Sequence, residues 1–400
     1  MSLIVKKFGG SSVADAGKVR NVARIVTDEY KEGNSVVVIL SAQGDTTDDL
    51  IAKANEINPK ASRREMDMLL ANGEQISISL CAMAIETLGF PVISLTGWQA
   101  GMTTDTNHGS ARIKKIDTAR LRDELDKKNI VIIAGFQGIN KYDDVTTLGR
   151  GGSDTTAVAI AAALGADLCQ IYTDVDGVYT GDPRLVQGAL KLDEITYDEM
   201  LELASLGAQI LHNRSVELAK RYHVPLEVLS SFSGKKGTIV KEVTTVESMQ
   251  VSGVARDNNV ARVSLTNLPD VPGIAFKTFS LLSQQKINVD IILQSIGRGD
   301  TKDISFTVTK NLVTPARELL ERYRDTLGYE EMIISEDVSK LSIVGSGMVN
   351  NPGVASKMFE ALFKAGVNIQ MISTSEIKVS VLIDKAQSDK AVAAVHEMFF

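Results

Sequence analysis

The residues best suited to chemistry lie in residues 147–166, TLGRGGSDTTAVAIAAALGA. The glycines of this stretch let the backbone approach a ligand, and Arg150 adds guanidinium donors suited to a carboxylate or a phosphate. Ser153 and Asp154 are residue types that cap helices, and the alanine-rich run after them predicts a helix. The first N–H groups of such a helix are unpaired and attract anions. Alone, the stretch is as typical of a buried helix after a glycine turn as of an anion site.

A second candidate is KFGGSSVAD at residues 7–15, which follows an apolar strand predicted over residues 3–8. Lys7 would stand at the strand exit, where open α/β sheets bind ligands, and Gly9 and Gly10 could offer N–H groups to phosphate. The motif is neither a P-loop nor GxGxxG, so neither of those nucleotide folds is indicated. A solvated lysine beside a tight turn is the alternative interpretation.

Other polar groups follow predicted strands in the same way. SAQGDTTDDL at 41–50 follows the strand 36–40, and VDGVYTGDPR follows the strand 170–174. The tyrosine ring of the second loop would suit adenine. Glu74 lies where Asn and Gly interrupt a helical pattern over residues 64–88, so we expect a break there with Glu74 facing a site. The four histidines form no HxH or HExxH spacing, so no metal-binding residues are predicted.

These candidates must be positioned by an α/β framework. Further strands are predicted at residues 91–95, 130–134 and 224–232, and helices at 111–128 and 197–222. The alternation predicts a mainly parallel sheet sandwiched by helices. We assign residues 1–232 to this catalytic domain and the Thr-, Lys- and Glu-rich residues 233–248 to a linker.

The remainder of the chain contains an internal repeat at an offset of 80 residues, beginning at Pro272 and at Pro352. Nine identities at that single offset indicate a duplication. Each copy has the βαββαβ order of a ferredoxin-like module. The first module spans 261–335. The second spans 340–400 and lacks a last strand, which we expect residues 249–256 to supply.

Composition excludes several classes. At 400 residues the chain is expected to form two or three domains, and a net charge of -7 with no basic block argues against nucleic-acid binding. The apolar run 157–164 is too short to span a bilayer, and the first residues do not resemble a signal peptide, so a cytoplasmic protein without membrane attachment is expected. Cys81 and Cys169 are expected to be buried, unpaired thiols.

Taken together, the motifs KFGGSSVAD, RREMDMLLANGEQIS, TTDTNHGSARI, TLGRGGSDTTAVAIAAALGA and YTDVDGVYTGDPR resemble those of aspartate kinases, in order and over essentially the whole chain. The repeated tail resembles that family's paired ACT regulatory modules. The resemblance implies an amino-acid-kinase fold, ATP as phosphoryl donor with Mg²⁺ bound to it, and the β-carboxylate of L-aspartate as acceptor, the first step towards lysine, threonine and methionine. Ser11 departs from the usual Thr after KFGG but keeps the hydroxyl.

The resemblance also assigns residues by position. Lys7 and Asp154 are the catalytic pair, in which Asp154 organises the lysine. The residues assigned to ATP are Lys7, Gly9, Gly10, Thr173, Asp174, Tyr179, Asp182 and Arg184. Those assigned to aspartate are Thr47, Glu74, Arg150, Gly151 and Ser153. Gln209 and Asn213 replace a frequent lysine and proline, which departs from the family pattern at a nucleotide contact.

This assignment is chemically coherent, because a carboxylate with a pKa of about 3.9 is already ionised at neutral pH and needs no general base. The reaction requires charge neutralisation and in-line positioning, which Lys7, the glycine N–H groups and the helix entrance could supply. Arg150 would hold the substrate α-carboxylate and Glu74 its ammonium group.

The ACT resemblance implies feedback control by lysine, threonine or both, and a homodimer or higher oligomer formed through these modules. The cleft residues assigned to an effector are Asp270, Gly273, Ile274, Ala275, Asn288, Asp290, Asn368 and Ile369. Asp290 is replaced by Gln370 in the second copy, so the first cleft would suit a cationic effector. Two alternatives stay open: a non-catalytic amino-acid sensor, and a related kinase acting on glutamate or on uridylate.

Overall fold

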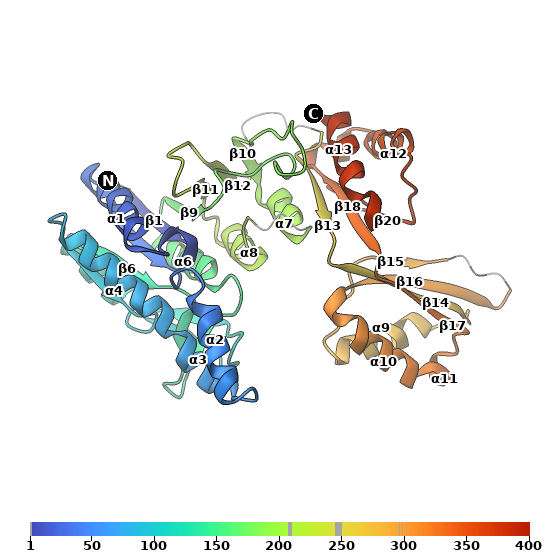
Figure 1. Ribbon diagram of the computed structural model, residues 1–400, viewed down its shortest axis with the longest axis horizontal. Coiled ribbons are helices and arrows are strands. Elements are labelled where there is room, and N and C mark those ends of the chain that lie inside the picture. Colours follow the sequence, from blue (N-terminus) through green and yellow to red (C-terminus); the bar gives the residue numbers. More distant parts are fainter. Residues whose placement is uncertain (1, 207–209, 245–249, 296, 298) are drawn as a thin grey trace. The chain divides into compact units, whose positions relative to one another are not determined.

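The computed structural model describes residues 2–206, 210–244, 250–295, 297 and 299–400 (Figure 1). The chain divides into two compact units. The first contains residues Met1–Val178, Lys191–Ser205 and Gln209–Glu247, and the second contains Tyr179–Leu190, Leu206–Ala208 and Ser248–Phe400.

The first unit is built on an eight-stranded sheet with the order β10-β12-β11-β9-β1-β2-β6-β3. All neighbouring strands are parallel except β11 and β12, which confirms the predicted mainly parallel sheet. Its strands are β1 (Leu3–Phe8), β2 (Ser35–Leu40), β3 (Val92–Leu95), β6 (Ile130–Ala134), β9 (Leu168–Thr173), β10 (Glu194–Thr196), β11 (Leu226–Ser230) and β12 (Thr238–Lys241).

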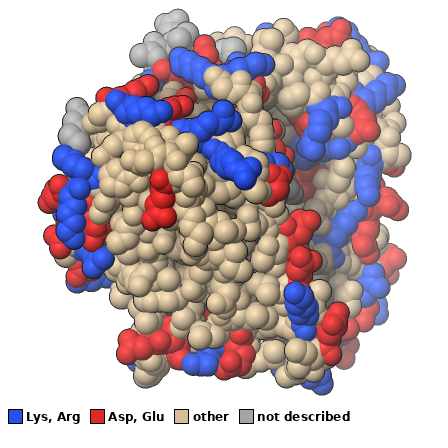
Figure 2. Space-filling model, turned by 60° about the vertical axis from the view of Figure 1, so that its left-hand side comes forward, with Lys and Arg blue, Asp and Glu red and all other residues tan. Residues whose placement is uncertain are grey.

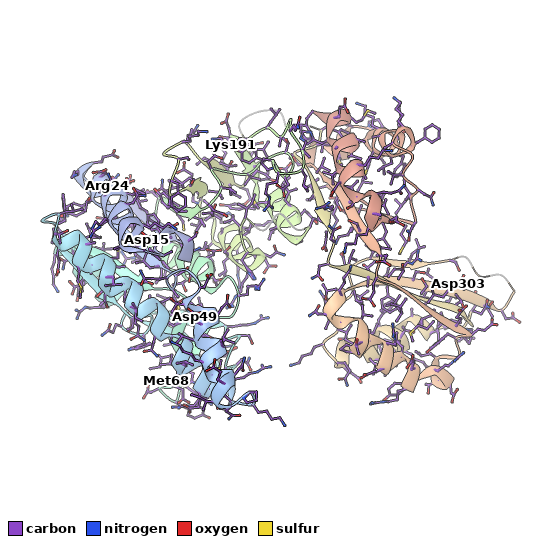
Figure 3. The ribbon with its side chains drawn as sticks, in the orientation of Figure 1. Asp15, Arg24, Asp49, Met68, Lys191 and Asp303 are labelled. Atoms are coloured by element: carbon purple, nitrogen blue, oxygen red, sulfur yellow. The ribbon has the colours of Figure 1, made fainter. Side chains whose placement is uncertain are left out.

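Helices cover both faces of this sheet. On one face α1 (Ala16–Lys31) and α4 (Asn72–Glu86) pack on β2 and β6, and on the other α6 (Gly152–Leu164) packs on β1, β2 and β9 (Figure 1). Asp15 begins α1 by accepting a hydrogen bond from the Lys18 N–H, and its position is labelled in Figure 3. The remaining helices are α2 (Thr46–Ile57), α3 (Arg63–Leu70), α5 (Ala119–Asp126), α7 (Tyr197–Ser205) and α8 (Asn213–Tyr222).

One prediction in this unit was wrong. The helix expected over 111–128 is β5 (Ile113–Ile116) followed by α5. Residues 113–116 pair with β4 (Met102–Thr104) as an antiparallel strand, so the first part of the predicted helix is a strand instead. A small sheet in the order β5-β4-β7-β8 includes β7 (Gln137–Ile139) and β8 (Val145–Thr147). Residues 233–248, which the sequence predicts as the domain boundary, contain the strand β12, whose Thr238 and Val240 are buried in the main sheet.

The second unit holds two four-stranded antiparallel sheets, with the orders β15-β16-β14-β17 and β13-β18-β20-β19. Both orders are those of a ferredoxin-like module. In the second sheet the last position is taken by β13, which precedes both copies in the chain. The elements are β13 (Gly253–Asp257), β14 (Val260–Pro269), α9 (Ile274–Gln284), β15 (Ile292–Gln294), β16 (Thr301–Thr309), α10 (Val313–Arg322), α11 (Arg324–Leu327), β17 (Glu331–Ser335), β18 (Val338–Val344), α12 (Val354–Lys364), β19 (Met371–Thr374), β20 (Lys378–Asp384) and α13 (Ser388–Phe399).

The segment Tyr179–Leu190 belongs to the second unit, although β9 and β10 on either side of it belong to the first. Val186 is buried in the same core cluster as Leu341 and Val395 of the second module. The Thr180 hydroxyl lies 2.8 Å from His396 Nε2, and the Val254 N–H donates to the Thr180 carbonyl at 2.7 Å. A loop predicted to touch ATP is therefore packed as part of a regulatory module.

The surface carries both signs of charge. On the face shown in Figure 2, Lys and Arg side chains alternate with Asp and Glu side chains around a broad area with few charges. Among the described residues, Arg63–Glu86 is the one helical stretch long and apolar enough to suit a membrane span. The α4 part of this stretch contributes Ile78, Cys81 and Ile85 to the core of the first unit. Core helices of soluble proteins pass the same test of length and hydropathy.

Candidate active site

A cavity of about 310 Å³ opens at the carboxyl ends of β1 and β2 and at the start of α6. It brings together nine residues predicted from the sequence: Lys7, Gly9, Gly10, Thr47, Glu74, Arg150, Gly151, Ser153 and Asp154. Of the six further lining residues, Gly149 and Gly152 belong to the glycine-rich stretch and Ser41, Ala42 and Gly44 to the loop 41–50 that the sequence had singled out, whereas Phe136 was not predicted. The first turn, the helix entrance and Glu74 therefore form one site, which favours the anion-site interpretation over a plain buried helix.

Lys7 and Asp154 form an ion pair at the floor of this cavity. Lys7 Nζ lies 2.6 Å from Asp154 Oδ1, and the two side chains are 11% and 13% exposed. The pairing results from the fold, because β1 carries the lysine and α6, packed across the strand, carries the carboxylate. A shielded pair of this kind holds the ammonium group in one place.

Glu74 contributes a second buried carboxylate. It lies in the first turn of α4, is 3% exposed, and accepts a hydrogen bond from the Ala42 N–H at 3.2 Å on Oε1. Its Oε2 is buried and has no hydrogen-bond partner. Burial raises the pKa of Glu74 to about 8, against which its backbone hydrogen bonds act. An unpartnered carboxyl oxygen at a cavity wall is suited to a cationic group of a ligand.

The entrance of α6 differs from the expectation. Ser153 and Asp154 were expected among its capping residues, but the helix begins at Gly152 after Gly151, without a side-chain cap. Gly151 has a φ of +68°, and a Cβ atom there would lie 2.2 Å from Cγ of His212, so only glycine fits. Gly152, Ser153 and Asp154 of its first turn line the cavity, and the unpaired N–H groups at a helix start attract anions.

Lys7, Gly9 and Gly10 line this cavity, but the other five residues predicted for the nucleotide do not. Thr173 ends β9 and its hydroxyl contacts Val175, and Asp174 follows it in the same unit. Tyr179, Asp182 and Arg184 lie in the segment that belongs to the second unit. Arg184 forms an ion pair with Asp182 at 2.8 Å, which lowers the pKa of that carboxyl.

Comparison with known proteins identifies the family. The amino acid kinase family matches residues 2–230, and an ACT domain matches residues 341–399. The aspartokinase of Mycolicibacterium smegmatis is 50% identical over 406 residues, covering 100% of this chain and 96% of the relative. That of Bacillus sp. (strain MGA3) is 50% identical over 400 residues, covering 100% and 97%.

The chain belongs to the aspartokinase family.

Solved structures agree. Aspartate kinase from Synechocystis is 44% identical with a TM-score of 0.57, covering 100% of this chain and 69% of that one. Escherichia coli aspartokinase III, solved in complex with aspartate and ADP, is 26% identical with a TM-score of 0.82 and full coverage of both chains. The chain is thus a kinase with the amino-acid-kinase fold followed by ACT modules.

In this aspartokinase the residues predicted for an effector lie at the helix starts of the ACT modules and in the loops that follow. Gly273, with a φ of +92°, precedes α9, and Ile274 and Ala275 are its first residues. Asn288 and Asn368 are both exposed in the loops before β15 and β19, and Ile369 follows as a half-buried residue.

The carboxylates among these residues are already paired. Asp270 Oδ1 lies 3.0 Å from Lys302 Nζ, and Asp290 Oδ2 lies 2.5 Å from Nζ of Lys340 on β18 of the other module. Reciprocally, Arg262 of β14 donates to Gln370 at 3.0 Å. The Asp290/Gln370 difference between the copies therefore matches two different cross-module contacts.

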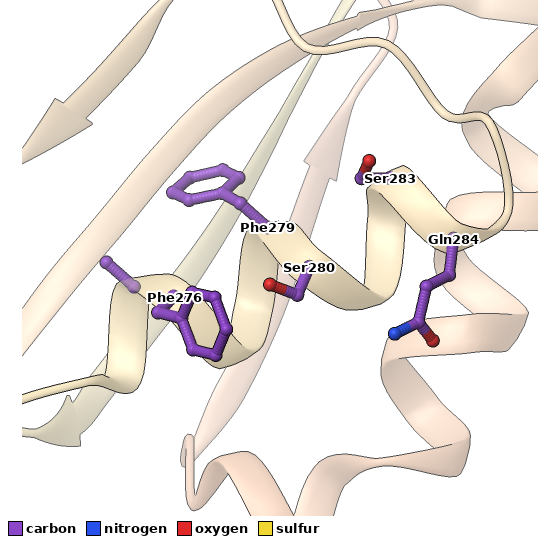
Figure 4. Close-up of a pocket in the computed structure, with 6 residues that line it drawn as sticks. Phe276, Phe279, Ser280, Ser283 and Gln284 are labelled. Carbon is purple, nitrogen blue, oxygen red and sulfur yellow. The ribbon is translucent and has the colours of Figure 1, made fainter.

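A hollow of about 520 Å³ lies along α9, lined by Ala275, Phe276, Phe279, Ser280, Ser283 and Gln284 (Figure 4). Only Ala275 is among the residues predicted for an effector. Phe276 is 76% exposed, whereas the Phe279 ring meets Phe306 edge-on at a centroid distance of 5.6 Å.

Two residues that support the site without lining its cavity, His212 and Arg214, were not predicted from the sequence. Both lie in GAQILHNRS, which was interpreted only through its departures from the family pattern. Of those, Gln209 lies outside the described residues, and Asn213 begins α8 and donates to Ser205 at 2.7 Å. No local pattern identifies such contacts, because their partners lie more than 60 residues away.

Proposed function

We propose that this aspartokinase transfers the γ-phosphoryl group of ATP to the β-carboxylate of L-aspartate, forming 4-phospho-L-aspartate. The observation that carries the proposal is the single cavity that joins the Lys7–Asp154 pair, a glycine turn, Arg150 and the unpartnered carboxyl oxygen of Glu74. Its lining contains two carboxyl groups and two cationic groups. Because Asp154 is paired with Lys7, Glu74 and Arg150 remain to bind the ammonium group and a carboxylate of an amino acid beside the phosphate.

On the acceptor side, Glu74 binds the ammonium group and Arg150 binds the α-carboxylate through its two-pronged guanidinium. Thr47, Gly151 and Ser153 surround the remaining space. Opposite charges at both ends of the cavity orient the β-carboxylate towards the donor. A neutral or uridine-type acceptor would leave Glu74 and Arg150 unpaired, which is costly in a closed site.

On the donor side, Lys7 and the N–H groups around Gly9 and Gly10 bind the transferring phosphates. A β-carboxylate oxygen attacks the γ-phosphorus, and the bond from that phosphorus to the bridging oxygen breaks, so ADP leaves with the electron pair. The acceptor is ionised before attack, and no proton has to be removed. Asp154 keeps Lys7 at its position rather than acting as a base.

We propose that Mg²⁺ enters the site bound to the phosphates of the nucleotide. Among the described residues no group of three His, Cys, Asp or Glu side chains could hold an ion. Mg²⁺ carried by nucleotide phosphates needs only one or two protein carboxylates, and Asp154 is the carboxylate nearest to Lys7. When bound, Mg²⁺ would neutralise charge on the phosphates.

For the rest of the nucleotide, we propose Thr173, Asp174, Tyr179, Asp182 and Arg184 on the basis of the family resemblance and of the ADP bound to the Escherichia coli relative.

For the effector, the same relative was also solved with lysine and aspartate bound. We propose lysine, threonine or both as effectors of this chain. A cationic effector at Asp290 would have to displace Lys340, which is 5% exposed. We propose oligomers through the edge strands β15 and β19.

The test is a coupled assay of ADP release with aspartate, glutamate or UMP as acceptor, repeated with lysine and threonine. We expect turnover with aspartate alone and a lowered rate with an effector. Turnover with glutamate or UMP instead would contradict the acceptor assignment. An absence of turnover together with calorimetric binding of amino acids would indicate a sensor.

A further inference from the structure

Asp67, on the inner side of α3, is the most completely bonded carboxylate near the kinase site. It is 1% exposed. Its two oxygens accept hydrogen bonds from the Gly109 N–H at 3.0 and 2.9 Å, and Oδ1 accepts one from the Thr147 hydroxyl at 2.5 Å. His108 Nδ1 lies 2.9 Å from Oδ2. A buried carboxylate is stable only when it is paired and hydrogen-bonded in this manner, so these groups are held in fixed positions around it.

The two segments that Asp67 joins are the loop after β4 and the end of β8. They are also bonded to each other, because the Ala111 N–H donates to the Thr147 carbonyl at 2.9 Å. From the other side, the Arg214 guanidinium of α8 donates to the carbonyls of Leu148 and Ala111, both at 3.0 Å. The buried carboxylate of Asp67 and the half-buried guanidinium of Arg214 thus each form hydrogen bonds to both segments.

What they support is the start of the acceptor site. Gly149 and Arg150 follow Leu148 directly, and both line the cavity. A Cβ atom on Gly149, where φ is +78°, would lie 3.1 Å from the Gly109 carbonyl oxygen. The loop that Asp67 fixes is therefore in contact with the turn that presents Arg150.

We propose that Asp67 is a positioning residue for the acceptor: through His108, Gly109 and Thr147 it fixes the turn that carries Arg150, and so determines affinity for the acceptor carboxylate. The inference rests on the proposed function, in which Arg150 binds that carboxylate. It does not involve Lys7, Gly9 or Gly10, which lie on β1 and its following turn. The effect should therefore appear in the KM for aspartate and not in the KM for ATP.

The test is Asp67→Asn in the full-length enzyme. An amide retains one acceptor oxygen but places an NH₂ group against a donor, so the loop shifts while the volume is kept. We expect the KM for aspartate to rise about tenfold or more, with the KM for ATP within about twofold. The matched control is Asp144→Asn, which makes the same change in a half-buried carboxylate that also binds α3, through Arg64 at 2.9 Å. Its two KM values should equal those of the wild type.

The outcomes separate the alternatives. If Asp67 had a purely structural role, Asp67→Asn would lower the fraction of active enzyme and hence the apparent kcat, but would leave the KM for aspartate unchanged. That result would overturn the proposal. If Asp67→Asn does not fold, Thr147→Val and His108→Ala each remove one partner without stranding the whole network. A KM for aspartate unchanged in both would also overturn it. Wild-type activity with aspartate, measured first, tests the proposed function separately.

Discussion

The residues assigned to the acceptor and those assigned to the nucleotide are organised differently. Glu74, Arg150 and Ser153 share one cavity of the first unit with Lys7. Tyr179, Asp182 and Arg184 belong with the second unit, where their segment packs into a module core through Val186. The residues proposed for the acceptor thus lie in the first unit, whereas three of the residues proposed for the nucleotide lie in a segment that packs in a core of the second unit. Changes on the two sides should therefore affect different kinetic constants, and four variants test this difference.

The largest effect is expected from Lys7→Ala. Loss of a charge aimed at the transferring phosphates should lower kcat about 10²–10³-fold, with little change in the KM for aspartate. Steady-state kinetics would measure both constants. Lys6 is the control, because its ammonium group lies on the other side of β1, 2.8 Å from Glu29. Lys6→Met should lower the thermal midpoint while preserving kcat per folded molecule, and a near-normal kcat in Lys7→Ala would contradict the role.

Arg150→Ala should act on the acceptor alone. A charge-assisted bond to the α-carboxylate contributes about 1.5–3 kcal/mol, so the KM for aspartate should rise about tenfold to a hundredfold. The KM for ATP should not change. Arg150→Lys should restore only part of the loss, because an ammonium group cannot bind the carboxylate in two places. An equal rise in both KM values would remove the distinction between the two sides.

Glu74 predicts a pH dependence. Its pKa is raised from 4.5 to about 8, so below pH 8 the free enzyme holds a proton that must leave before an ammonium group binds. The KM for aspartate should therefore rise as the pH falls below 8, approaching about tenfold per unit. Glu74→Gln should have a raised KM that is independent of pH in this range.

The same shift affects stability. Since the folded state keeps the proton after the unfolded chain releases it, Glu74 should make the protein less stable as the pH rises from 4.5 towards 8. Thermal midpoints of the wild type and of Glu74→Gln should diverge over that interval, with the variant gaining relative stability. Parallel midpoint curves would show that Glu74 is ionised in the free enzyme.

The smallest effect is expected from His396→Gln in α13. His396 is 3% exposed and bonds to Thr180 in the nucleotide segment. Replacing it should raise the KM for ATP about twofold to fivefold, as expected for one net hydrogen bond, and leave the KM for aspartate unchanged. Phe363→Ser is the control, because Phe363 of the same module is 82% exposed. A change in the KM for aspartate of His396→Gln would show that the two sides are not separable.

Much of the framework followed from local patterns. Apolar runs identified β1, β2 and β6, and the repeat at an offset of 80 identified both modules and the missing strand, whose place is taken by β13. The candidate residues around Lys7, Glu74 and Arg150 were also found, because polar residues at the ends of parallel strands collect at one sheet edge.

Failures occurred where a distant partner decided the local state. Residues 113–116 became β5 because β4 was available to pair with them. At the start of α6, the cap is Gly151 instead of a Ser or Asp side chain, and His212, the residue before α8, leaves no room for a Cβ atom there. Propensity is a weak preference of well under 1 kcal/mol per residue, and such contacts exceed it.

By itself, the sequence determined the order of the elements, the duplication and the chemical types at the kinase site, since these depend on periodicity and residue identity. Only the tertiary structure decided that Glu74 has an unpartnered oxygen, that Asp67 and Arg214 hold the turn before Arg150, and that Tyr179–Leu190 packs with a regulatory module. The physical reason is that burial and hydrogen bonding are properties of the folded surroundings, contributed by residues far apart in the chain.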